Sequence, residues 1–121
     1  MKKSLLLAVL LFTAFTISYA QGGRQQSTPE ERAKRTTEWM KTELKLTQEQ
    51  VVQVDSINLD YAKKQQALRD DAKGDRSKIR EAMTTLTKER ETAFAKVLTK
   101  EQMEAYKKKV SERRNNARQR R

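Results

Sequence analysis

Two stretches of this chain, Leu46-Thr47-Gln48-Glu49-Gln50 and Leu98-Thr99-Lys100-Glu101-Gln102, share the pattern L-T-x-x-Q. The Thr in each can cap a helix, because its hydroxyl accepts a hydrogen bond from an amide of the first turn. The Gln three residues later can bond back to the N–H of the Thr, which completes a capping box. The preceding Leu can pack as a hydrophobic staple, which pairs Leu46 with Val51 and Leu98 with Met103. We expect both stretches to start helices and to have a structural role.

Helical signals continue outward from both motifs. Thr28-Pro29-Glu30-Glu31 is a third helix start without a staple, with Pro at its favoured first position. Gly74 lies where a helix would end, and Asp75 or Ser77 can cap the helix that follows. We therefore expect helices over about 29–43 and 48–73, a third that begins after Asp75 or Ser77 and continues to about Val97, and a fourth from residue 100.

Apolar residues at helical spacing support these boundaries. No segment alternates with period two, so we expect an all-α fold of about four helices, with the second and third as a long antiparallel hairpin and the others flanking it. In residues 48–73, Asn58 and Gln65 interrupt the apolar stripe, and Arg90 lies inside the stripe of the next helix. The apolar positions are Ala33, Trp39, Met40 and Leu44; Val51, Val54, Ile57, Tyr61, Leu68 and Ala72; Ile79, Ala82, Met83, Leu86, Ala93, Phe94 and Val97; and Met103, Tyr106 and Val110.

The first 20 residues have the pattern of a cleavable signal peptide. Lys2 and Lys3 precede an apolar run from Leu5 to Ile17, and Ser18-Tyr19-Ala20 supplies small residues at a cleavage site. We expect export, with a bacterial periplasm as the best fit and no transmembrane segment after cleavage. The remaining divisions would be a flexible segment at 21–27, a helical domain at 28–112 and a basic C-terminal tail at 113–121.

The composition indicates a small, basic, cysteine-free domain. The chain carries 27 Lys and Arg against 16 Asp and Glu, and removal of residues 1–20 leaves 25 − 16 = +9. Eight of these cations lie between Lys107 and Arg121, where Glu112 is the one acid. Without disulfides, a chain this short and polar has a thin core, so we expect it to rely on long, well-capped helices or to pair with a second copy.

Two stapled boxes behind an export signal resemble the LTxxQ signature of the Spy/CpxP family of periplasmic chaperones and stress adaptors. The resemblance implies a cradle-like homodimer whose concave face presents cations and apolar side chains to unfolded clients. Carried onto this hairpin, it implies a client-binding face that includes Lys63, Lys64, Arg69, Arg80, Met83, Leu86 and Arg90.

Those residues also have structural interpretations. The periodicity of Met83 and Leu86 favours core packing over client contact. The stem of Arg90 can pack against apolar neighbours while its charge reaches water.

The chain lacks the residues that most catalytic and metal sites need. There is no His and no Cys, which excludes Ser–His and Cys–His nucleophiles and leaves no usual ligand for a transition metal. Asp70, Asp71 and Asp75 do not match the spacing of a calcium loop, so we interpret them as solubilising charge and a cap. We expect no enzyme activity, no cofactor and no metal.

Three binding functions remain open. The first is an ATP-independent holdase chaperone for unfolded or acidic envelope proteins, which a cationic surface would attract. The second is an envelope-stress adaptor that docks on a sensor kinase. The third is a binder of polyanions or envelope surfaces through the basic C-terminus. Export argues against nucleic acid as the natural ligand, and no aromatic residues are interleaved with the basic ones to form a stacking platform for bases.

Overall fold

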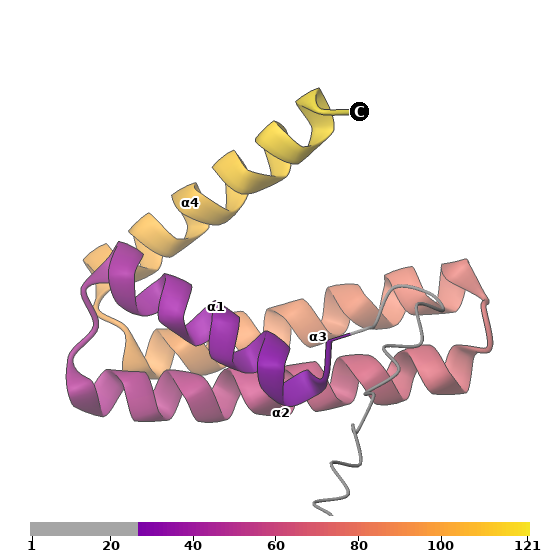
Figure 1. The fold of residues 1–121 in the computed structure, drawn as a ribbon, viewed down its shortest axis with the longest axis horizontal. Helices are drawn as coiled ribbons and strands as arrows, with labels where there is room; N and C mark the ends of the chain where they lie inside the picture. The colour runs from indigo at the N-terminus through magenta and orange to yellow at the C-terminus, as the bar shows by residue number, and fades with distance from the viewer. Residues whose placement is uncertain (1–26) are drawn as a thin grey trace, which may run out of the picture.

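The computed structural model describes residues 27–121, and in this part of the chain every regular element is an α-helix (Figure 1). The helices are α1 (Pro29–Leu44), α2 (Gln48–Ala72), α3 (Arg76–Val97) and α4 (Lys100–Gln119). The predicted all-α fold is therefore confirmed. The predicted signal peptide at 1–20 and all but the last residue of the segment 21–27 lie outside the described residues.

The helices α2 and α3 form the long antiparallel hairpin that the sequence predicts (Figure 1). Lys73 ends α2 in the left-handed conformation at φ 46°, and Gly74 follows at φ 88°. The left-handed cap is thus Lys73, one residue earlier than expected. Asp75 caps α3, because its carboxylate accepts hydrogen bonds from the backbone N–H groups of Ser77 and Lys78 at 3.1 and 3.3 Å.

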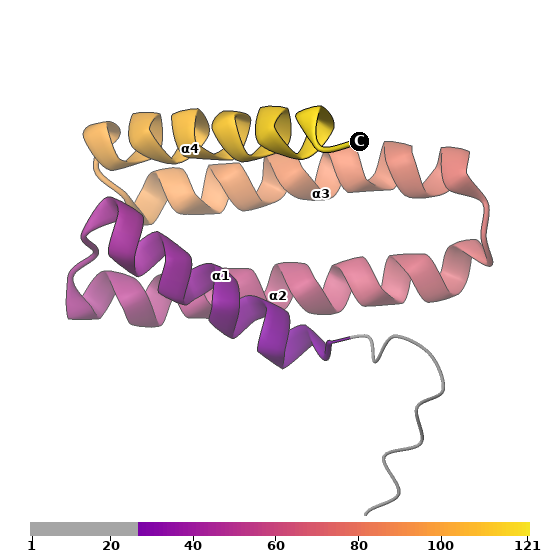
Figure 2. The same ribbon diagram turned by 45° about the horizontal axis from the view of Figure 1, so that its top comes forward.

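The two flanking helices behave differently. Figure 2 shows α1 crossing the hairpin beside α2, whereas Figure 1 shows α4 slanting away from the hairpin toward its C-terminal end. The fourth helix continues to Gln119, so most of the segment set apart as a basic tail belongs to α4. None of the helices in residues 27–121 is long and apolar enough to cross a membrane.

The core gathers at the end of the hairpin where the α1–α2 and α3–α4 connections meet. Phe94 and Tyr106 pack edge-to-face with ring centroids 5.2 Å apart, and Trp39 lies 6.4 Å from Tyr106. Between Ala62 and Leu86, around the far end of the hairpin, no residue is fully buried. The buried cluster consists of Met40, Leu44, Leu46, Val54, Phe94, Leu98 and Tyr106.

Both L-T-x-x-Q stretches form complete capping boxes, as predicted. The structure adds a direct link between them, because the amide of Gln50 donates to Oε1 of Gln102 at 2.7 Å and accepts from its Nε2 at 3.1 Å. Gln50 also donates to the carbonyl of Val97, and Gln102 donates to that of Leu44, at 3.1 and 3.2 Å. This reciprocal pair, the glutamine clasp, ties the end of α1 and the start of α2 to the turn between α3 and α4.

The buried face of α2 differs from the predicted stripe. Asn58, expected as an interruption, is only 2% exposed and donates from Nδ2 to Thr37 Oγ1 of α1 at 3.1 Å. Ala62 is buried as well, whereas Leu68 and Ala72 are half-buried. The reason is that α1 covers α2 through a partly polar contact, so hydrogen-bonding residues occupy positions that an apolar period cannot identify.

Candidate functional site

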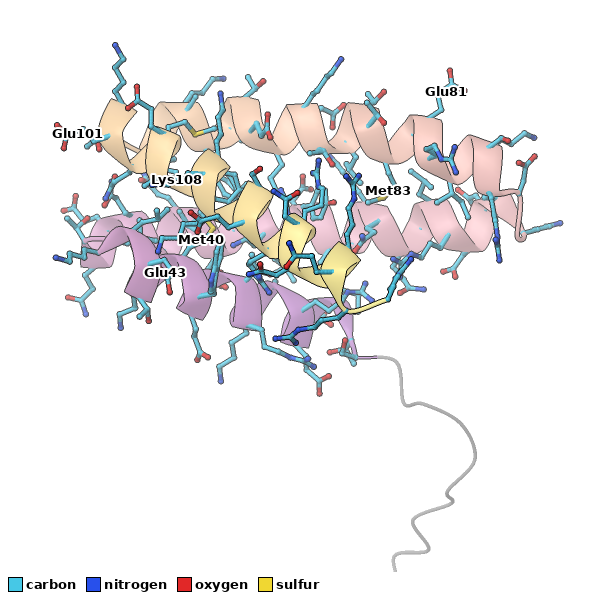
Figure 3. The ribbon with its side chains drawn as sticks, turned by 90° about the horizontal axis from the view of Figure 1, so that it is seen from above. Met40, Glu43, Glu81, Met83, Glu101 and Lys108 are labelled. Atoms are coloured by element: carbon cyan, nitrogen blue, oxygen red, sulfur yellow. The ribbon has the colours of Figure 1, made fainter. Side chains whose placement is uncertain are left out.

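The residues expected to bind clients divide into three groups by exposure. Met83 and Arg90 are half-buried, and Leu86 is 8% exposed, which supports the core interpretation of Leu86. Figure 3 shows Met83 on the side of α3 that faces α2, opposite Glu81. The exposed residues are Lys63, Lys64, Arg69 and Arg80.

The structure brings Lys64, Leu86 and Arg90 together around a groove between α2 and α3, here called the hairpin groove. It consists of three adjoining depressions of about 370, 250 and 380 Å³, and Lys64 lines all of them. Lys63, Arg69, Arg80 and Met83 do not line it. Its apolar surface comes from Ile57, Tyr61, Ala67, Leu68, Ala72, Ala82, Leu86 and Ala93. Its charged side chains are Asp60, Lys64, Asp71, Lys78, Glu89 and Arg90.

Lys64 links the two helices across this groove. Its Nζ lies 3.0 Å from a carboxylate oxygen of Asp60 on α2 and 3.8 Å from one of Glu89 on α3. The hydrogen bond to Asp60, followed by the charge of Asp60, raises the pKa of Lys64. All three side chains are more than half exposed, so these pairs add little stability and can exchange partners with an incoming chain.

Arg90 lies at the end of the groove nearer the core cluster, and its guanidinium stacks on the ring of Tyr61. Its Cζ is 3.8 Å from the ring centroid of Tyr61 and 5.9 Å from that of Phe94, within the range of cation–π attraction. The side chain of Arg90 thus packs as that interpretation expects, but its guanidinium rests on Tyr61 and its Nε is buried, instead of reaching freely into water. Sequence reasoning did not pair these two residues, although they lie at similar distances along the chain from the turn at 73–75.

The basic end of α4 forms a second charged surface. Arg113 places its Cζ 4.7 Å from the ring centroid of Trp39, and Lys109 Nζ lies 2.8 Å from Glu43 of α1. The hydrogen bond to Glu43, followed by its charge, raises the pKa of Lys109. All residues from 111 to 121 are exposed. The basic end of α4 is defined as Arg113, Arg114, Arg118, Arg120 and Arg121.

The described part of the chain does not assemble a metal site, since residues 27–121 contain no group of three His, Cys, Asp or Glu side chains placed to hold an ion. Asp75 caps α3. Asp70 accepts a hydrogen bond from the side-chain amide of Gln66 at 3.2 Å. In the hairpin groove, apolar side chains lie beside charged ones of both signs.

These features define an all-α protein with a helical hairpin and an open groove along it. Residues 19–106 match the model of the domain of unknown function DUF4890, and the chain belongs to that family. The matched region covers α1 to α3 and the first part of α4, up to Tyr106. Comparisons with curated proteins and with solved structures gave no match.

Proposed function

We propose that this protein is an exported, ATP-independent holdase chaperone that binds unfolded envelope proteins in the periplasm. The observation that carries the proposal is the hairpin groove, which combines apolar surface with exposed charge along two helices. A groove of this kind holds an extended chain through many small apolar contacts and adaptable ion pairs. The resemblance of the two L-T-x-x-Q boxes to the Spy/CpxP signature supports the same function.

The end of the hairpin near Gly74, which has no fully buried residues, is the second support for this proposal. Around it, Leu68, Ala72, Ile79 and Ala82 are only half-buried, because α1 and the core cluster lie at the other end. Apolar surface that the monomer leaves partly open is available to a client or to a second copy of the chain. A cradle-like homodimer is part of the proposal.

The test is suppression of aggregation by the purified protein, without ATP, using a chemically denatured client at low and moderate salt. We expect suppression near equimolar amounts that persists at moderate salt. The variant Leu68→Gln should weaken it, because Leu68 lines the groove and is half-buried. The matched control is Val52→Gln, which changes a side chain 69% exposed outside the groove.

Absence of suppression at every ratio would reject the holdase itself, whereas equal loss in both variants would reject the hairpin groove as its client site. Preferential capture of a single folded envelope protein would instead favour the sensor-kinase adaptor.

A second candidate function, binding of polyanionic surfaces, rests on the basic end of α4. Residues 112–121 are all exposed, and they contain five arginines and one acidic residue, Glu112. Such a surface releases counterions on binding, so affinity for vesicles that contain acidic phospholipid should fall steeply with salt. Binding that is insensitive to salt would exclude this function.

A further inference from the structure

Helix α4 divides its seven basic residues between two environments. Lys109 pairs with Glu43 of α1 at 2.8 Å, and Arg113 stacks on Trp39 of α1 at 4.7 Å from the ring centroid. The other five cations are exposed, and none of them lies within 4.0 Å of a carboxylate in residues 27–121. They are Lys100, Lys107, Lys108, Arg114 and Arg118. Most of the positive charge of α4 is therefore available to a partner outside the chain.

Four of these exposed cations lie on one side of the helix. They follow one another at intervals of seven, seven and four residues, close to whole turns of an α-helix: Lys100, Lys107, Arg114 and Arg118. At 3.6 residues per turn they fall within about 40° of arc, and at 1.5 Å per residue they extend over about 27 Å. Lys108 lies about 100° away from Lys107 around the axis. We call the four aligned residues the basic stripe.

The stability of the helix does not account for the basic stripe. The helix dipole favours cations near the C-terminus, as at Arg118, but it disfavours Lys100 at the first helical position. Arg114 and Arg118 are four residues apart, and like charges at this spacing destabilise a helix. An anionic partner would relieve both costs.

The apolar residues of α4 are used in the core. Tyr106 belongs to the buried cluster, and Met103 and Val110 pack against it. From Ser111 to Gln119 the helix is exposed throughout and carries Ala117 as its one hydrophobic side chain. This half of α4 therefore lacks the apolar face that insertion into a membrane requires, and its contacts with a partner are polar and charged.

The cationic surface is wide as well as long. Lys88 of α3 lines the same depression of about 390 Å³ as Lys107, and the one acid in the lining is Glu91. Figure 1 shows α4 slanting away from the hairpin, so its distal half stands clear of the other helices. The basic stripe and Lys88 together form a two-dimensional patch rather than a single line of charge.

We infer that the basic stripe lies along an anionic phospholipid surface and binds its headgroups without insertion. A headgroup layer presents phosphate groups over its whole area, so it can neutralise the unevenly spaced stripe and the neighbouring Lys88 at once. A linear polyanion could follow the stripe but would leave Lys88 aside. The inference rests on the second candidate function, the binding of polyanionic surfaces, and it assigns the contact to one side of α4.

The first test is cosedimentation of the purified protein at low salt with vesicles of phosphatidylglycerol and phosphatidylcholine. The stripe variant is Lys107→Gln with Arg114→Gln, and its control is Lys63→Gln with Lys108→Gln; each pair removes two exposed cations. A cation near an anionic surface contributes about fivefold to affinity, so the stripe variant should bind roughly 25-fold more weakly. The control should lose less than about threefold, because its cations lie farther from the lipid. Circular dichroism checks that both variants remain folded.

The second test measures orientation, and it uses the absence of cysteine from the chain. One fluorophore is attached at Ser111→Cys, about 40° from Lys107 around the helix, and another at Asn116→Cys, about 180° from it. Both positions are exposed and uncharged, so labelling leaves the charge pattern intact. With vesicles that carry nitroxide on their headgroups, we expect the label at position 111 to be quenched more strongly than the label at position 116.

Equal weakening of the two double variants, or equal quenching of the two labels, would overturn the inference. The binding of polyanionic surfaces would then stand, with net charge as its cause. Absence of vesicle binding, with soluble polyphosphate still bound, would assign the basic stripe to a linear polyanion instead. Absence of binding to both probes would reject the second candidate function together with this inference.

Discussion

The glutamine clasp makes a quantitative prediction about stability. Replacement of Gln50 by Ala removes four hydrogen bonds: one that its Oε1 accepts from the N–H of Thr47, one that its Nε2 donates to the carbonyl of Val97, and two shared with Gln102. A typical hydrogen bond contributes about 1 kcal/mol net. Because the site is only partly buried, water can replace some of these partners, and we expect a loss of about 2–4 kcal/mol in the free energy of unfolding.

The shared bonds make the two glutamines energetically coupled. Gln102→Ala also removes four bonds, one from Thr99, one to Leu44 and the same two shared bonds. The double variant loses six bonds rather than eight, so its destabilisation should fall short of the sum of the single variants by roughly 1–2 kcal/mol.

Urea unfolding, followed by far-UV circular dichroism and by the fluorescence of Trp39, measures all three variants. Gln53→Ala, an exposed change in α2, is the matched control and should alter stability by less than about 0.5 kcal/mol. If the effects of Gln50→Ala and Gln102→Ala were simply additive, the two hydrogen bonds that these side chains share would contribute nothing to stability.

Three other measurements test the same structure. Thr47→Ala with Thr99→Ala should cost roughly 1–4 kcal/mol from two lost caps without a selective loss of client binding, and a stable double variant that no longer binds would contradict the capping role. Charge reversal at the basic end of α4 should abolish polyanion binding but only slow aggregation suppression, whereas equal loss of both would place the client site on α4. Glu43→Gln should lower the pKa of Lys109 toward its ordinary 10.5, as measured by nuclear magnetic resonance, and an unchanged pKa would show that the pair does not form in solution. Because folding raises this pKa, the pair stabilises the protein below pH 10.5 and its contribution is lost as the pH rises through the raised value.

The helices and their ends were predictable because the signals are local. A Thr with Gln three residues later satisfies its own backbone groups wherever the helix lies, so both boxes formed as expected. The connection at Gly74 is short, so the hairpin follows from chain geometry alone.

The features that join distant segments could not be read from those signals. The contact between Gln50 and Gln102 links two caps 52 residues apart, and each cap is already complete without it. The stacking of Arg90 on Tyr61 has only a weak sequence signal, since Tyr61 lies 12 residues before the turn at 73–75 and Arg90 lies 15 residues after it. Asn58 was misjudged because a buried polar residue looks like a break in an apolar stripe until its partner, Thr37, is known.

The distribution of buried residues decides which parts of the surface can be tested by mutation. Leu86 lines the groove but is only 8% exposed, so its substitution would destabilise the protein as well as impair binding, and the two effects could not be separated. Leu68 and Lys64 lie in the groove but contribute less to the core, because both retain solvent contact. A loss of binding in variants of these two residues, with the urea transition unchanged, therefore reports on the groove itself and separates client contact from stability.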